Sequence, residues 1–275
     1  MIPATFDYVE ADSADAAIAA LTEHGDEAKL MAGGHSLIPL MRFRLATPAV
    51  VVDIGRLDGL SYIREEGGHI AIGALTTHRT LEMDQLLKAQ APLLAHVASK
   101  VGDPSVRNRG TLGGALAHGD PASDLPAALL ALGGSVIAKG PNGEREIAAA
   151  DFFTGFLETA LAPDEMLTEI RIPNGANAGW SYQKFNRRAM DWAIVGVAAV
   201  VPRNNGQARI ALVNMGPTPM TAAAVEQALA DGASIDDAAA RAAEGAAPPE
   251  DLNGDAEYRT HLAKVLVKRA LTEAG

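Results

Sequence analysis

Cysteine is absent from this 275-residue chain, which excludes disulfides, thiolate nucleophiles and cysteine-ligated zinc or iron–sulfur centres from it. An electron-carrying metal would therefore have to belong to a partner chain. No apolar run comes near the roughly 20 residues that a membrane span needs. The amino terminus also lacks the basic start and apolar core of a signal peptide. The sequence thus predicts no membrane span and a cytoplasmic location.

Basic clusters are missing as well. The net charge is −11, and basic residues group only in short pairs such as Arg187-Arg188, so no nucleic-acid partner is expected. The seven histidines form no H-E-x-x-H pair, and no Ser/His/Asp triad or paired carboxylates mark a hydrolytic centre. With 48% hydrophobic and 21% charged residues, the composition is that of a soluble globular protein of one large domain or two modest ones.

A pair of adjacent glycines stands out in Met31-Ala32-Gly33-Gly34-His35-Ser36, between an apolar run and the more helical segment 37–45. Adjacent glycines admit positive φ and let a ligand approach the backbone without a Cβ in the way. Ser36 can cap the following helix or donate its hydroxyl, and free N–H groups at a helix start attract anions. The turn is therefore a candidate phosphate site, although an ordinary strand-to-helix turn explains a single glycine pair equally well.

Hydrophobic periodicity and turn residues predict alternating helices and strands up to residue 173. Ser13 is expected to cap a first helix that Gly25 ends, and Asn142-Gly143 is expected to form a hairpin turn. The expected helices are 13–21, 37–45, 77–87, 92–101 and 125–132, and the expected strands are 28–32, 49–54, 61–64, 69–73, 135–139 and 144–148. Segment 28–54 forms one α/β unit, with the glycine turn at the carboxyl end of its first strand.

A change in composition at residues 174–179 marks the expected domain boundary. We predict a first domain over 1–176, with subdomains of about 1–56 and 57–176, and a carboxyl-terminal domain over 177–275. In this second domain, three strands are expected to form an antiparallel sheet, and helices follow them, which gives a small α+β domain. The strands are 180–185, 193–202 and 208–214, the last two joined by Asn205-Gly206; the helices are 222–229, 235–243 and 256–270, the last with Tyr258, Leu262, Val265 and Leu266 on one apolar face.

A second glycine turn, Thr111-Leu112-Gly113-Gly114, shares the character of the first and is also expected to follow a strand-like run. Two such turns that face each other across a cleft can hold the two phosphates of a dinucleotide with backbone N–H groups, without any lysine. Neither turn has the G-x-G-x-x-G spacing of a Rossmann-type nicotinamide site, so that class is disfavoured.

Three stretches together, residues 32–36, 107–114 and 120–124, resemble the FAD-binding medium subunit of molybdenum hydroxylases, the xanthine dehydrogenase and carbon monoxide dehydrogenase family. The similarity covers the whole chain. It implies an α+β chain that begins with a two-subdomain FAD-binding domain of the vanillyl-alcohol-oxidase (PCMH) type. A small α+β carboxyl domain follows in this family.

The resemblance also implies which residues hold the cofactor, and it implies no catalytic residue in this chain. The pyrophosphate would lie at the two glycine turns. The ribityl and adenosine parts and the flavin ring would be held by residues later in the chain. The implied residues are Ala32, Gly33, Gly34, His35 and Ser36 with Thr111, Gly113 and Gly114 for the pyrophosphate, Leu37 for the cofactor without a more specific role, His118 and Asp124 for the ribityl and adenosine parts, Leu167 for a backbone contact to the flavin ring, Lys184 for its polar edge, and Asp191-Trp192 against the isoalloxazine.

Each of these residues has a plainer interpretation when taken alone. His35 and His118 would be surface or satisfied core residues, Lys184 a solvated strand residue, and Leu167 part of the core. Trp192 replaces a tyrosine of some family members and is equally compatible with a buried packing role. This departure leaves the access of an electron acceptor to the flavin open.

The function implied by the resemblance is electron transfer. A large subunit with the molybdenum cofactor would hydroxylate carbon monoxide, an aldehyde, a purine or an N-heterocycle. A small subunit with two [2Fe-2S] clusters would pass the electrons to FAD in this chain, and from there they would go to a quinone, NAD or oxygen. The assembly would be a dimer of heterotrimers, and the substrate would be chosen outside this chain.

Two other functions stay open at this point. A self-contained flavin oxidase of the vanillyl-alcohol type shares the logic of the first domain, but such enzymes add a larger substrate domain than the residues after 177 provide. A non-catalytic nucleotide-binding module would need no electron partner.

Substitution of either glycine turn tests the phosphate interpretation. Gly34→Val or Gly113→Val is expected to abolish FAD binding because the added side chain excludes the pyrophosphate. The flavin absorbance that remains after dialysis measures the loss. Stoichiometric flavin in either variant would contradict the two-turn interpretation.

Overall fold

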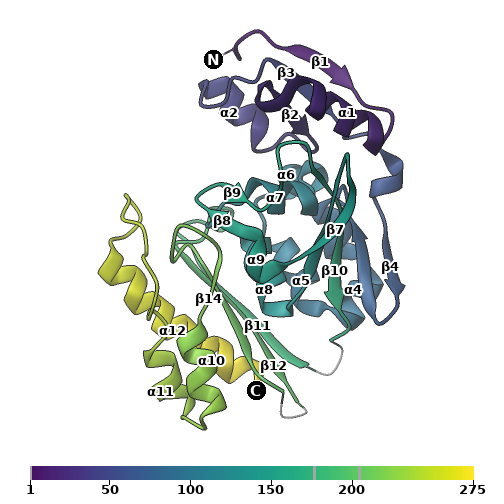
Figure 1. Ribbon diagram of the computed structural model, residues 1–275. Coiled ribbons are helices and arrows are strands. Elements are labelled where there is room, and N and C mark those ends of the chain that lie inside the picture. The colour runs from purple at the N-terminus through teal and green to yellow at the C-terminus, as the bar shows by residue number, and fades with distance from the viewer. Residues whose placement is uncertain (1, 176–177, 204–205) are drawn as a thin grey trace.

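The computed structural model describes residues 2–175, 178–203 and 206–275. Three larger sheets with their helices follow one another along the molecule (Figure 1): an N-terminal part, a middle part and a C-terminal part. A small two-stranded sheet, formed by residues 153–155 and 158–159, belongs to the middle part. The α+β class predicted from the sequence is confirmed. Among the described residues, no helix combines the length and the apolar character needed to cross a bilayer.

The N-terminal part is a three-stranded parallel sheet in the order β1-β3-β2. Ser13 caps the first helix as predicted, because its hydroxyl accepts a hydrogen bond from the Ala16 amide at 3.1 Å, and Gly25 ends that helix. Strand β1 was not predicted, since its Asp-Tyr-Val-Glu sequence carries no apolar run. The elements are β1 (Asp7–Glu10), α1 (Ala14–His24), the 3-10 turn η1 (Gly25–Glu27), β2 (Ala28–Met31), α2 (Leu37–Phe43) and β3 (Val50–Asp53).

The middle part is a five-stranded antiparallel sheet in the order β4-β5-β10-β6-β7. The predicted Asn142-Gly143 hairpin, β6 with β7, is confirmed, and the predicted strands 61–64 and 69–73 correspond to β4 and β5, which pair antiparallel. Its strands and helices are η2 (Asp58–Leu60), β4 (Ile63–Glu66), β5 (His69–Gly73), α3 (His78–Met83), α4 (Gln85–Gln90), α5 (Pro92–Ser99), α6 (Pro104–Arg109), α7 (Leu112–His118), α8 (Asp124–Leu132), β6 (Ser135–Gly140), β7 (Gly143–Ala148), α9 (Ala149–Phe152), β8 (Phe153–Gly155), β9 (Glu158–Thr159) and β10 (Met166–Pro173).

Two predictions for this part were wrong in detail. The single helix expected at 77–87 is split at Asp84, whose backbone is extended and whose carboxylate caps α4 through the Leu87 amide at 2.8 Å. The second glycine turn follows a helix, α6, and not a strand. Asp103 caps α6 and Pro104 begins it, a pair that is typical of helix starts.

The C-terminal part is an antiparallel sheet with helices on one side (Figure 1). It has four strands and not the predicted three, because Met220–Thr221 adds β14 beside β13. The last helix buries Leu262 and Leu266 as predicted, but Tyr258 is 40% exposed. The elements are β11 (Ala178–Phe185), β12 (Val195–Pro202), β13 (Arg209–Val213), β14 (Met220–Thr221), α10 (Ala223–Ala230), α11 (Ile235–Ala240) and α12 (Ala256–Ala274).

Two predicted boundaries fall partly on residues outside those described. The division between residues 176 and 177 lies there, and the Asn205-Gly206 turn lies there in part. Both remain predictions, as does the subdomain boundary near residue 56.

Helix α8 joins the middle and C-terminal parts. All its residues are buried, and it packs on β10 of the middle sheet as well as on β12 and β13 of the C-terminal sheet. An apolar helix without a polar face is stable only when it is covered all round. The start of α8, at Asp124, is therefore held in place from both sides.

A substitution at Gly179 tests the packing of α12 on β11. A Cβ at this position would come within 1.7 Å of the Ala274 carbonyl oxygen. Gly179→Ala is expected to lower the free energy of unfolding by about 1–3 kcal/mol, the usual cost of overpacking. Gly59→Ala is the matched control, because no atom lies within 4 Å of its Cβ position. Urea unfolding measures both variants, and equal stability of the two would contradict the packing.

Candidate functional site

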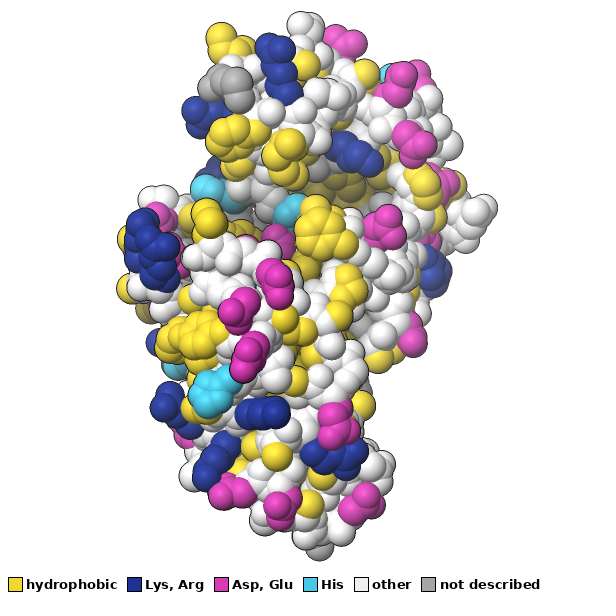
Figure 2. All heavy atoms as spheres, turned by 90° about the vertical axis from the view of Figure 1, so that its left-hand side faces the viewer, with side chains coloured by type: hydrophobic (Ala, Val, Ile, Leu, Met, Phe, Trp, Pro, Cys, Tyr) yellow, Lys and Arg dark blue, Asp and Glu magenta, His cyan; other side chains and the backbone are white. Residues whose placement is uncertain are grey.

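A cavity of about 710 Å³ lies where the three parts of the chain meet. In Figure 2, histidine and hydrophobic side chains gather at the level where the N-terminal part meets the middle of the molecule. The structure brings every predicted site residue to this one cavity. It is lined by Ala32, Gly33, Gly34, His35, Ser36, Leu37, Thr111, Gly113, Gly114, His118, Asp124, Leu167, Lys184 and Trp192, among others.

The first glycine turn offers unused backbone donors to the cavity. Within the part of the chain that the structure describes, the amides of residues 33–37 have no hydrogen-bond partner. Gly34 has φ +75°, which bends the chain so that successive N–H groups can converge. Such a run of amides forms a concave anion site.

Ser36 does not cap α2. It occupies the position before the helix, but its backbone is already helical and its side chain makes no capping bond. Since an N-cap residue normally has extended backbone angles, the hydroxyl is left on the cavity wall. Of the two roles considered for Ser36, the structure therefore excludes capping.

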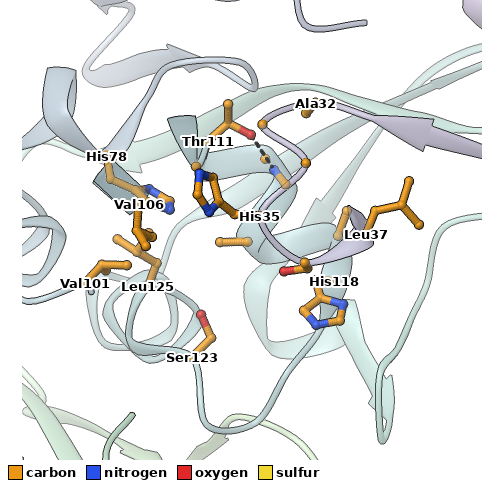
Figure 3. Close-up of a pocket in the computed structure, with 18 of the residues that line it drawn as sticks. Ala32, His35, Leu37, His78, Val101, Val106, Thr111, His118, Ser123 and Leu125 are labelled. Carbon is orange, nitrogen blue, oxygen red and sulfur yellow. Dashed lines mark hydrogen bonds between the residues drawn. The ribbon is translucent and has the colours of Figure 1, made fainter. Parts of the chain in front are cut away.

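The second glycine turn differs from the first in its hydrogen bonds. The amide of Leu112 donates to the Thr76 carbonyl oxygen at 2.9 Å, and that of Gly113 to the Ala74 carbonyl oxygen at 2.8 Å. The Gly114 amide donates to the Thr111 hydroxyl oxygen at 3.1 Å, the dashed line in Figure 3. Among the described residues the Thr111 amide has no partner, so this turn can still offer a ligand that N–H group and the hydroxyl proton of Thr111.

The glycines themselves let two pieces of chain meet. A Cβ on Gly33 would come within 2.1 Å of the Arg109 carbonyl oxygen, and one on Gly113 within 2.6 Å of the Ala74 Cβ. A Cβ on Gly34 would meet Ile38 at 2.7 Å. Gly113→Val would therefore displace the backbone at Ala74, and Gly34→Val would strain the positive φ and push against the Ile38 side chain, so that neither valine acts only by filling the cavity.

Asp124 and Lys184 bond to each other at the cavity wall. Lys184 Nζ donates to Asp124 Oδ2 at 2.8 Å and to the Lys100 carbonyl oxygen at 3.0 Å, and the Tyr182 hydroxyl donates to Asp124 Oδ1. Burial raises the pKa of Asp124, and the Lys184 ammonium opposes that shift. Burial and the Asp124 charge raise the pKa of Tyr182 well above its usual value. This pairing links α8 to β11 and was not predicted.

Trp192 lies at the rim of the cavity. Its side chain is 59% exposed, which contradicts the alternative of a buried packing residue. It also lines a second hollow of about 830 Å³, between Asp120 of the middle part and Arg259 of the C-terminal part. Leu167, by contrast, is buried in β10.

His78 is a cavity residue that the sequence did not single out. It follows the Thr77 cap directly and has the local pattern of an ordinary helix start. Only 4% of it is exposed, and its Nδ1 has no hydrogen-bond partner. Burial, and then the nearby His35 and Arg107, lower the pKa of His78 to about 4. Its ring is therefore neutral near pH 7.

The lowered pKa of His78 predicts a pH effect on stability. The unfolded chain, with a histidine pKa near 6.5, binds this proton more readily than the folded protein does. The stability that the folded protein gains from the neutral His78 is thus fully present above pH 6.5 and is lost as the pH falls towards 4. His78→Leu should lessen the acid loss of unfolding free energy by about 3 kcal/mol. Urea unfolding at several pH values measures this, and parallel curves for both proteins would contradict it.

Comparison with known proteins places this geometry in a family. Residues 4–175 match the model described as the FAD binding domain in molybdopterin dehydrogenase. Residues 180–274 match the CO dehydrogenase flavoprotein C-terminal domain. The carbon monoxide dehydrogenase medium chain of Hydrogenophaga pseudoflava is 43% identical over 100% of this chain and 98% of its own length. The caffeine dehydrogenase subunit beta of Pseudomonas sp. (strain CBB1) is 36% identical over 100% and 96%.

Solved structures match this chain as well. Carbon monoxide dehydrogenase from Hydrogenophaga pseudoflava, in a form that lacks the Mo-pyranopterin moiety, matches with a TM-score of 0.96 at 44% identity, over 100% of this chain and 98% of that one. Quinoline 2-oxidoreductase from Pseudomonas putida 86 matches with a TM-score of 0.93 at 33% identity, with the same coverage. The chain therefore belongs to the family of FAD-binding medium subunits of molybdenum hydroxylases.

Proposed function

We propose that this chain binds FAD in the cavity and acts as the electron-transfer subunit of a molybdenum hydroxylase. It would take electrons from [2Fe-2S] clusters of a small subunit and pass them to an external acceptor, while a molybdenum-bearing large subunit hydroxylates the substrate. The observation that carries this proposal is the run of unpartnered amides at residues 33–37. A diphosphate is the ligand group that such donors fit.

The residues present fit FAD. The cavity volume of about 710 Å³ lies within the usual range for ligand sites. The amides of the first turn would hold the pyrophosphate, and Thr111 would add a hydroxyl donor beside the bare Cα of Gly114. His118 and Asp124 would bind the ribityl and adenosine parts. Leu167 and Lys184 would contact the flavin ring, with Trp192 beside it at the rim.

When bound, FAD supplies the redox chemistry, and the chain supplies binding and orientation. The Asp124–Lys184 ion pair fixes the ammonium near the cavity without filling it. Trp192, which lines the cavity and is 59% exposed, would lie beside the flavin at the opening. Among the described residues, no cluster of histidines and carboxylates could hold a metal ion.

The partners follow from the relatives. A matching solved structure is that of a Cu,Mo-CO dehydrogenase, and several relatives are named as medium chains or subunits of dehydrogenases. We therefore propose a cytoplasmic dimer of heterotrimers. Relatives named for carbon monoxide, caffeine and nicotine show that similar medium chains occur with different substrates. The substrate would be chosen in another subunit, and the acceptor would be a quinone, NAD or oxygen.

Anaerobic reduction of the bound flavin tests the proposal. The isolated chain, loaded with FAD, should keep its flavin oxidised with carbon monoxide, aldehydes, purines and N-heterocycles. The same chain in complex with its molybdenum and iron–sulfur subunits should lose the flavin absorption band when the accepted substrate is added. Flavin reduction by substrate in the isolated chain would identify a self-contained oxidase. A fold that takes up no FAD would identify a nucleotide module of another kind.

A further inference from the structure

His78 is the buried polar side chain in the cavity that has no role in the proposed function so far. It is the first residue of α3, and its backbone amide donates to the Gly110 carbonyl oxygen at 2.9 Å. This bond fixes the residue against the chain that leads into the second glycine turn. Figure 3 shows its ring directed towards His35, which belongs to the first turn.

One nitrogen of the ring lacks a partner. Nδ1 is shut off from solvent and has no hydrogen-bond partner among the described residues. Folded proteins leave few buried polar side-chain atoms unpaired, because each one loses its hydrogen bonds to water. The other edge of the ring, Cδ2 with Nε2, lies beside Gly110.

The surroundings are shaped to admit the ring. A Cβ on Gly110 would come within 2.7 Å of His78 Nε2, so only glycine leaves room for the imidazole there. Arg107, which lies close enough to affect the ring, already donates to Glu82 and to the carbonyl oxygens of residues 101 and 102. His78 itself lines the cavity, so a ligand there can reach the ring.

The charge state of the ring decides what it can offer. Its pKa of about 4 keeps the imidazole neutral near pH 7. A neutral imidazole has one N–H donor and one bare nitrogen. It can donate to a phosphate or ribose oxygen without bringing a second charge close to Arg107.

We propose that His78 contacts FAD and donates its imidazole N–H to an oxygen of the adenosine diphosphate half of the cofactor. The inference rests on the proposed function. The position of the ring indicates the adenosine diphosphate half, because His78 lies between His35 of the first glycine turn and Gly110, which precedes Thr111 of the second.

Replacement by an apolar residue separates binding from folding. In His78→Leu, the dissociation constants for FAD and for ADP should both rise by the same factor, roughly 10- to 100-fold, as expected for a lost bond to a charged group. The unfolding midpoint of the ligand-free variant near pH 7.5 should stay equal or rise, because an unpaired polar group has been removed. His78→Gln, which keeps an N–H donor, should recover part of the affinity.

His69→Leu is the matched control. Its Nε2 is the other buried and unpartnered imidazole nitrogen of the described residues, but His69 does not line the cavity. The dissociation constants of His69→Leu for FAD and ADP should stay within twofold of those of the parent protein. Isothermal titration or flavin fluorescence quenching measures them. These readouts need no partner subunit and no turnover.

Three outcomes would overturn the assignment of His78. One is a destabilised ligand-free His78→Leu with unchanged FAD affinity, which makes the residue structural. Another is weakened FAD binding with unchanged ADP binding, which places the contact on the flavin half. The third is equal loss of affinity in His69→Leu. If the parent chain binds neither FAD nor ADP, it is the proposed function that fails, and this result is distinct from all three.

Discussion

Gly33 and Arg109 meet backbone to backbone, and the cavity depends on that contact. A side chain on residue 33 would overlap the Arg109 carbonyl oxygen, so the loop after β2 can touch the end of α6 only with glycine there. The contact joins the parallel sheet to the antiparallel one and sets the two glycine turns side by side. The turns then do different work. The amides of residues 33–37 in the first turn have no partner among the described residues, while Leu112 and Gly113 in the second turn donate to the carbonyl oxygens of Thr76 and Ala74.

A second contact, between α8 and β11, lies on the C-terminal side of the cavity. Helix α8 is covered by two sheets, and its first residue, Asp124, binds Lys184 and Tyr182 of β11. Breaking a buried ion pair by removing one partner is costly, because the other charge is left unpaired. The C-terminal part is thus held where Lys184 and Trp192 can complete the cavity wall. The family's medium chains match over both parts, in line with a site that needs both.

Local patterns predicted most of the elements and the location of the site. The Ser13 cap, the Asn142-Gly143 hairpin and both glycine pairs act within a few residues, so the sequence is enough to identify them. Strand β1 was missed because its pairing with β3 depends on residues more than forty positions away. For the same reason the bonded amides of the second turn, the Asp124–Lys184 pair and the cavity position of His78 could not be predicted. Their partners are brought close only by the fold.

Hydrogen exchange of the backbone amides tests the central claim, that the first turn holds the diphosphate. With FAD added, exchange at residues 33–37 should slow strongly, since these amides have no partner in the ligand-free protein. Leu112 and Gly113 should be protected with or without FAD, because they already donate to carbonyl oxygens. Tight FAD binding without any slowing at residues 33–37 would contradict the account.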